Sequence, residues 1–184
     1  TELFKAVKDR EIAQEHIAEV AKSSKRGYML DEGADGTLLP RKLDAPFLRD
    51  ERFRKFVLDE RLKTAVGAFI GSRPRLVTDQ LFFKPPRFGS AKPYHQDNGY
   101  FFIKPDDLVI TAWIALDDVD EENGCLRYIE GSHLGEVFEH KAIEGQPYNS
   151  VPDPKHIDLS KEVLAPVGKG GVVFHHSKTL HTSH

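Results

Sequence analysis

The feature that most constrains the fold is a change in sequence pattern at residue 76. After that point, short apolar or β-branched runs of strand length alternate with turns rich in proline and glycine. The runs cover residues 76–84, 108–116, 126–129 and 172–174. Many short strands with turn signals are typical of a β-sandwich or jelly roll rather than of alternating βα units. The sequence therefore predicts a β core over residues 76–184.

The first 75 residues are expected to be mainly helical. Apolar residues recur on one face of a helix at Leu62, Ala65, Val66, Phe69 and Ile70, and Gly71 predicts its end. A weaker pattern of the same kind covers residues 11–22, and residues 31–36 form a polar loop between the two. With 184 residues, the chain can bury a single core. We expect one domain, mainly β, with a helical front segment over residues 1–75.

The composition excludes several classes of protein. Hydrophobic residues make up 39% and charged residues 30%, which is ordinary for a soluble globular protein. A net charge of −3 argues against a nucleic-acid surface, and no apolar run reaches the roughly 18 residues that span a bilayer. The single cysteine, Cys125, fits a cytoplasmic or other reducing intracellular compartment. The oligomeric state is left open, and a monomer is compatible with these data.

The chemistry centres on His95-Gln96-Asp97 and a distant histidine. On an extended segment, residues two apart point to the same side, so His95 and Asp97 can face one ion. Two imidazoles and one carboxylate with open positions form the facial triad of non-haem Fe(II) oxygenases. Four distal residues could supply the third ligand: His175, His176, His181 and His184. His181 shares a side with Ser183, whereas His175 and His176 precede a bend and could instead donate hydrogen bonds to the ligands.

Six sequence blocks extend this interpretation. They occur in order at residues 80–86, 94–97, 112–116, 122–126, 131–133 and 170–183. Together they resemble the phytanoyl-CoA dioxygenase (PhyH) family of Fe(II)/2-oxoglutarate oxygenases, well over residues 76–184 and loosely before them. The resemblance implies a double-stranded β-helix (jelly roll) with His95, Asp97 and His181 as iron ligands. It also implies Fe(II) as cofactor, 2-oxoglutarate and O2 as co-substrates, and hydroxylation of a small organic molecule with release of succinate and CO2.

The resemblance also carries over residues around the iron. Gln80, Trp113, Ser183 and Lys42 match positions that contact 2-oxoglutarate in the family. The alternatives are that Gln80 is a solvated strand residue, Trp113 a core residue and Lys42 a surface residue. Asn98, Tyr100, Phe102 and the loop over residues 144–158 are expected to border the substrate pocket. His176 and His133 are expected to be structural, and no catalytic residue is expected beyond the metal ligands. The arginine that clamps the far carboxylate of 2-oxoglutarate, and the closing strands, are expected beyond His184.

Three alternatives to a 2-oxoglutarate-dependent hydroxylase are considered. Related halogenases have a small residue in place of this aspartate, so Asp97 favours hydroxylation over halogenation. A jelly-roll metal enzyme of the cupin kind could use the same ligands without 2-oxoglutarate. A non-catalytic jelly-roll binding protein would keep the fold and lose turnover.

Overall fold

The computed structural model describes residues 28–32, 35–86 and 89–184. The chain divides into two units, one made of residues 1–62 and 75–90 and the other of residues 63–74 and 91–184. The predicted helix over residues 11–22 lies outside the described residues.

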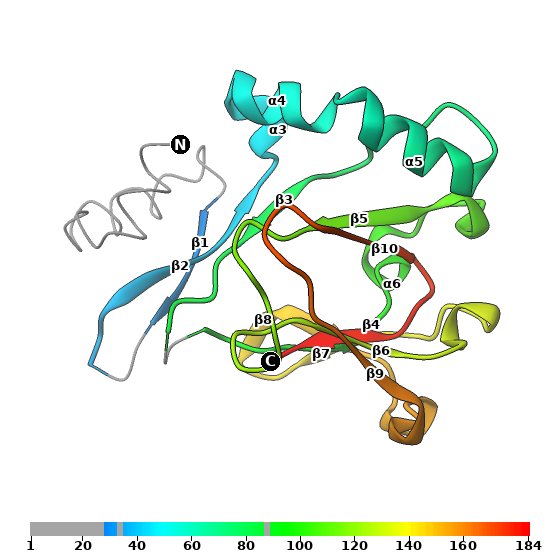
Figure 1. Ribbon diagram of the computed structural model, residues 1–184. Coiled ribbons are helices and arrows are strands. Elements are labelled where there is room, and N and C mark those ends of the chain that lie inside the picture. Colours follow the sequence, from blue (N-terminus) through cyan, green and yellow to red (C-terminus); the bar gives the residue numbers. More distant parts are fainter. Residues whose placement is uncertain (1–27, 33–34, 87–88) are drawn as a thin grey trace. The chain divides into compact units, whose positions relative to one another are not determined.

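The first unit contains a three-stranded antiparallel sheet in the order β1-β2-β3 (Figure 1). Its strands are β1 (Tyr28–Glu32), β2 (Leu38–Asp44) and β3 (Gln80–Phe82). The expectation of a helical front segment is therefore wrong for residues 28–44, which form a β-hairpin. Its turn is built by Gly36, which has a φ of 79°, and by the Asp35 carboxylate, which accepts a hydrogen bond from the Thr37 N–H. Asp31 and Glu32 of the predicted polar loop thus lie in β1, and Asp35 and Gly36 lie in the turn before β2.

Three helices follow β2: α3 (Pro46–Arg49), α4 (Glu51–Val57) and α5 (Glu60–Ile70). Asp50 caps α4 by accepting the Arg52 N–H, and this satisfies one of the free amides of the first turn. The helix predicted from apolar periodicity is confirmed as α5. It ends just before Gly71, whose φ of 67° suits the left-handed position that follows many helices.

The second unit is mainly β. An antiparallel sheet has the strand order β4-β11-β6-β9, β5 pairs with β10, and β7 pairs with β8. The elements are β4 (Lys92–His95), α6 (Asn98–Phe101), β5 (Ile110–Ile114), β6 (Leu126–Ile129), β7 (Lys141–Ile143), β8 (Gln146–Val151), β9 (Glu162–Ala165), β10 (Val172–His176) and β11 (His181–Ser183). The runs predicted as strands in this unit are confirmed as β5, β6 and β10. The expected loop over residues 144–158 instead contains β8.

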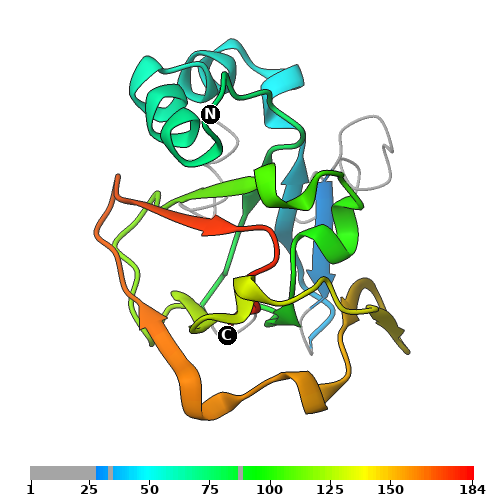
Figure 2. The ribbon, with the colours of Figure 1, turned by 90° about the vertical axis from the view of Figure 1, so that its right-hand side faces the viewer.

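Within this unit the β5–β10 pair and the four-stranded sheet lie on opposite sides, and the chain passes from one to the other between β10 and β11 (Figures 1 and 2). Leu180, which precedes β11, is 1% exposed, and Cys125, Leu126 and Ile129 are buried with it. This apolar layer supports β11 in the middle of its sheet. Two of the predicted metal ligands lie at strand ends, His95 at the end of β4 and His181 at the start of β11, and Asp97 follows β4.

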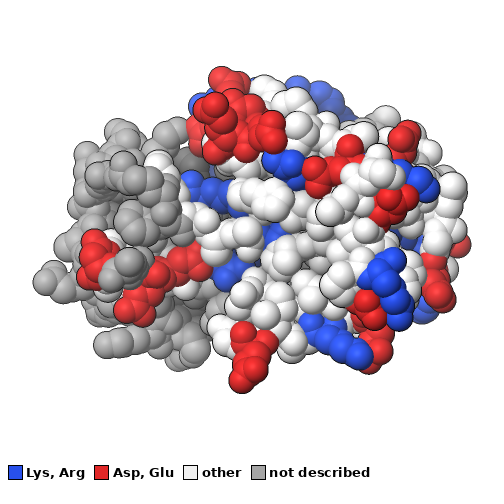
Figure 3. Space-filling model, turned by 90° about the horizontal axis from the view of Figure 1, so that it is seen from below, with Lys and Arg blue, Asp and Glu red and all other residues white. Residues whose placement is uncertain are grey.

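The described surface carries charges of both signs. In Figure 3, acidic and basic side chains alternate with uncharged areas across the part of this face that is described. Among the described residues, none of the helices has both the length and the apolar character that a membrane span requires.

Candidate metal centre

Two adjacent strands deliver the three predicted metal ligands. His95 is the last residue of β4, His181 is the first residue of β11, and the two residues pair directly across the antiparallel ladder. Asp97 lies just beyond β4 with φ and ψ of −56° and −40°, at the start of α6. The sequence argument that an extended segment aligns His95 with Asp97 is therefore wrong in detail. The chain turns after Gln96, and this turn brings the carboxylate back toward the imidazole.

The three side chains form a converging group that could hold a metal ion. One ligand atom from each of His95, Asp97 and His181 lies within 4.8 Å of the others. The Nε2 atoms of His95 and His181 are each 3.7 Å from Asp97 Oδ1. His95 and His181 are buried, and their ring centroids are 4.1 Å apart. The donor set of two nitrogens and one oxygen fits a facial triad.

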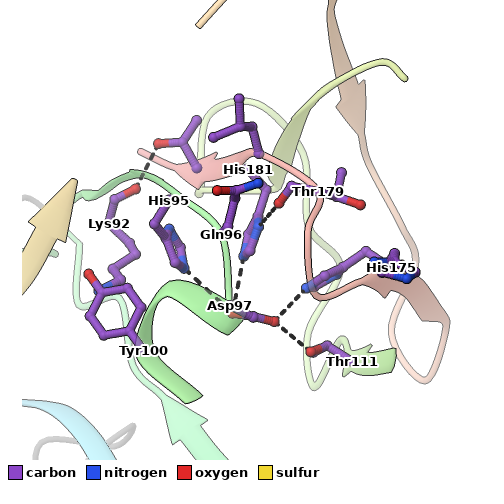
Figure 4. A network of polar contacts seen from close by, with 12 residues as sticks. Lys92, His95, Gln96, Asp97, Tyr100, Thr111, His175, Thr179 and His181 are labelled. Atoms are coloured by element: carbon purple, nitrogen blue, oxygen red, sulfur yellow. Dashed lines mark hydrogen bonds and ion pairs between the residues drawn. The ribbon is translucent and has the colours of Figure 1, made fainter. Parts of the chain in front are cut away.

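Backbone carbonyls fix the orientation of both imidazoles. Nδ1 of His95 lies 2.9 Å from the Pro93 carbonyl oxygen, and Nδ1 of His181 lies 2.9 Å from that of Thr179. Because a carbonyl oxygen only accepts, each Nδ1 carries the proton and donates it. Each Nε2 therefore presents its lone pair to the centre of the group, as a metal ligand requires (Figure 4).

The electrostatics of the site support the same protonation states. Burial lowers the pKa of His95 well below its usual value, and burial together with His175 lowers the pKa of His181 to about 4. Burial alone would raise the pKa of Asp97, but His181 and the hydrogen bond from His175 bring it below its usual range. The group is thus two neutral imidazoles and one carboxylate near neutral pH.

A hydrogen-bonded chain holds the second oxygen of Asp97. Oδ2 accepts from the Thr111 hydroxyl at 2.5 Å and lies 3.0 Å from Nε2 of His175. The Tyr128 hydroxyl lies 2.8 Å from Nδ1 of His175, and burial raises the pKa of Tyr128. Sequence reasoning left His175 open as a donor to the ligands and did not single out Thr111 or Tyr128. The positions of Thr111 and His175 depend on the register of β5 and β10, which pairs them directly.

Gln96, between the two ligands, anchors the turn. Its side chain is fully buried, donates to the carbonyls of Glu136 and Lys178 at 2.9 and 2.8 Å, and accepts the Phe138 N–H at 2.8 Å. Its own N–H donates to Nε2 of His140. The role of Gln96 could not be predicted from the sequence, since no local pattern marks a residue whose partners lie 40 or more positions away.

The structure gives two of the residues predicted to contact 2-oxoglutarate a definite place near the triad. Trp113 lies on β5 two residues from Thr111, so both side chains share the face of the strand that carries the Asp97 contact. Ser183 lies two residues after His181, and its buried hydroxyl donates to the Gly124 carbonyl at 2.7 Å.

Gln80 and Lys42 belong to the first unit. Gln80 is exposed on β3, and Lys42 forms an ion pair with Asp44 at 3.1 Å. Their contact with 2-oxoglutarate stays a prediction.

The three residues predicted to border a substrate have different surroundings. The ring of Tyr100 packs edge-on against His95 with centroids 5.5 Å apart, and its hydroxyl accepts from Lys92 Nζ at 2.8 Å. The buried amide of Asn98 bonds both the N–H and the carbonyl of Ile103, so it closes a local turn. Phe102 is 81% exposed. Of these three residues, Tyr100 is therefore the one shown to contact a proposed metal ligand, His95.

His176 and His133 lie where structural residues are expected. The Nδ1 atom of His176 accepts the Lys178 N–H at 3.1 Å, and this bond stabilises the turn after β10. His133 is exposed in a short helical turn over residues 132–134.

A comparison with models of known protein families shows to which family the chain belongs. Residues 11–184 match the model for phytanoyl-CoA dioxygenase (PhyH). The chain belongs to the PhyH family. A peroxisomal phytanoyl-CoA dioxygenase of Mus musculus is 34% identical to this family member over 142 residues, which cover 73% of the chain and 41% of the relative. A probable alpha-ketoglutarate-dependent hypophosphite dioxygenase of Stutzerimonas stutzeri is 30% identical over 161 residues, with 83% and 54% covered.

Solved structures share the fold of this PhyH member. The non-heme alpha ketoglutarate dependent carbocyclase SnoK from nogalamycin biosynthesis superposes with a TM-score of 0.67 at 24% identity, covering 97% of this chain and 68% of SnoK. The chain spans about half the length of the curated relatives named above, 54% and 41%.

Proposed function

We propose that this PhyH member is an Fe(II)/2-oxoglutarate-dependent dioxygenase that hydroxylates a C–H bond of a small organic molecule. The observation that carries the proposal is the convergence of His95, Asp97 and His181, with both Nε2 lone pairs directed at one point beside Asp97 Oδ1. Such a triad leaves positions open on the iron. Membership of the PhyH family and the alpha-ketoglutarate-dependent relative support the choice of co-substrate.

The iron, when bound, supplies the redox chemistry that splits O2. In the balanced reaction one oxygen atom enters the substrate as a hydroxyl, and the other enters succinate as 2-oxoglutarate loses CO2. The protein's part is to hold the metal, orient the co-substrate and exclude water. His95, Asp97 and His181 are proposed to hold the iron, and Trp113 and Ser183 to contact 2-oxoglutarate together with Gln80 and Lys42. We further propose that the two-layered β unit is part of a double-stranded β-helix.

Asp97 favours hydroxylation over halogen transfer. Its Oδ1 lies 3.7 Å from Nε2 of both His95 and His181, so its carboxylate would take the position that a halide would need on a bound metal. Tyr100, whose ring packs edge-on against His95, is proposed to contact the substrate.

The experiment is a binding and turnover assay. Fe(II) and 2-oxoglutarate added without oxygen should give a visible charge-transfer band, and a substrate panel under oxygen should identify compounds that stimulate succinate formation. The band should need both additions, so Fe(II) alone and 2-oxoglutarate alone serve as controls. A folded protein that binds Fe(II) without developing the band would contradict the proposal and favour a metal enzyme that does not use 2-oxoglutarate.

A further inference from the structure

The two oxygens of Asp97 have different surroundings. Oδ1 faces Nε2 of both His95 and His181 at 3.7 Å. Oδ2 points the other way and is held by the Thr111 hydroxyl at 2.5 Å and by His175 at 3.0 Å (Figure 4). One oxygen is thus directed at the proposed metal position, and the other is held by the protein.

Both ring nitrogens of His175 make hydrogen bonds. An ionised carboxylate only accepts hydrogen bonds, so the contact to Asp97 Oδ2 requires a proton on Nε2 of His175. The other nitrogen, Nδ1, lies 2.8 Å from the Tyr128 hydroxyl. Both His175 and Tyr128 are less than 9% exposed. The chain from Tyr128 through His175 to Asp97 therefore fixes the ring of His175 at both nitrogens.

This network joins the β5–β10 pair to the four-stranded sheet through His175. Thr111 and His175 are paired across β5 and β10, whereas Tyr128 lies on β6, directly opposite His181 of β11. Asp97 itself lies on no strand and follows β4 at the start of α6. A carboxylate on a turn would be free to rotate, and the contacts from Thr111 and from His175, whose ring is in turn held by Tyr128, remove that freedom.

We propose that His175 is a positioning residue that keeps Asp97 bound to the metal through Oδ1 alone. A six-coordinate ion held by three protein atoms has about three positions left. If Asp97 rotated to bind through both oxygens, it would take one of them. On the proposed function, two of these positions would accept 2-oxoglutarate and the third O2, so the benefit of binding through one oxygen rests on that function. The proposal that Asp97 binds through Oδ1 alone does not depend on it.

The test uses Mn(II) alone, without 2-oxoglutarate, and measures the relaxation of water protons by the bound ion. We expect His175→Phe to lower the relaxivity by about a third, because one of about three metal-bound waters is replaced by Oδ2. His175→Gln, whose amide can still donate to Oδ2, should restore most of the signal. The matched control is His176→Phe at the neighbouring histidine, whose Nδ1 accepts the Lys178 N–H rather than bonding Asp97, and it should behave as the parent protein.

Three outcomes would overturn the proposal. Unchanged relaxivity in a folded His175→Phe variant would make His175 merely structural. An equal loss in His176→Phe would make the effect unspecific. A loss of Mn(II) affinity well beyond the roughly 100-fold expected for a neighbour of a ligand would make His175 a ligand itself. If His175→Phe does not fold, His175→Asn replaces it, because its shorter amide does not reach Oδ2. A missing charge-transfer band in the parent would instead contradict the proposed function and leave the Mn(II) result valid.

Discussion

At the residue scale, a single substitution of Asp97 can test its role in metal binding without unfolding the protein. Its carboxylate is directed at the proposed metal position, yet it is held by side chains rather than packed in the apolar layer. Asp97→Ala should weaken metal binding by more than about 100-fold, a loss larger than that of an outer hydrogen-bonding partner. It should also abolish succinate formation and leave the circular dichroism spectrum unchanged. Asp107→Ala, at an exposed carboxylate that pairs with Lys178, is the control. Retained succinate formation would remove Asp97 from the triad.

Ser183 can be tested against its neighbour in the same strand. The Ser183 hydroxyl donates to the Gly124 carbonyl and that of Thr182 donates to the Lys92 carbonyl, each at 2.7 Å. Ser183→Ala and Thr182→Ala should each cost about 1 kcal/mol in the free energy of unfolding, measured by urea denaturation. Because Ser183 lies on the side of β11 that carries His181, its hydroxyl is proposed to turn from the Gly124 carbonyl to a carboxylate of bound 2-oxoglutarate. Ser183→Ala alone should then also raise the KM for 2-oxoglutarate, by roughly 10-fold for the loss of one hydrogen bond to a charged group. Equal KM values in the two variants would make Ser183 purely structural.

At the scale of elements, the turn that carries the ligands depends on close packing at Gly99 in α6. A Cβ atom at this position would lie 2.4 Å from the His140 ring. That ring cannot easily move, because Nε2 accepts the Gln96 N–H at 3.0 Å and Nδ1 bonds the Phe138 carbonyl at 2.8 Å. Gly99→Ala should therefore lower the free energy of unfolding by about 1–3 kcal/mol and weaken metal binding through the displaced turn.

The control is Gly135→Ala, where the added Cβ would meet only the Ser132 carbonyl oxygen at an ordinary 3.5 Å. Urea denaturation and Mn(II) titration of both variants check the prediction. Adding His140→Ala to Gly99→Ala should cost less than the sum of the two single changes, since the clash is then gone. Strict additivity would show that Gly99 and His140 do not interact in this way.

Some helices and strands could be predicted from the sequence and others could not. The α5 helix and β6 were predictable because their apolar patterns are local. The β1–β2 hairpin was not, since β2 contains Pro40 and basic residues that hide its alternation and it pairs with β3 about 40 positions later. Likewise, His95 and Asp97 could be named from their types and spacing and His181 from the resemblance to the PhyH family, whereas the contact of His175 with Asp97 depends on a register that no local pattern fixes.

At the scale of the whole molecule, the buried imidazoles make the metal-free protein sensitive to acid. The pKa of His181 is lowered to about 4, and burial also lowers the pKa values of His95, His140 and His176. In the unfolded chain a histidine has a pKa of about 6.5. As the pH falls below that value, the unfolded state takes up protons that the folded state does not, so the folded state loses stability.

We therefore expect the free energy of unfolding of the metal-free protein to be highest above about pH 6.5 and to fall toward about pH 4, with His181 alone accounting for on the order of 3 kcal/mol. Urea denaturation at several pH values in the presence of a chelator measures this curve. His181→Asn should flatten the curve, whereas His133→Asn at an exposed position is the control. Saturating Mn(II) should raise the free energy of unfolding at neutral pH, because the ion binds the folded state, and the gain should shrink as protons compete for the imidazoles. A His181→Asn curve parallel to that of the parent would mean that the buried imidazole takes up its proton within the folded state.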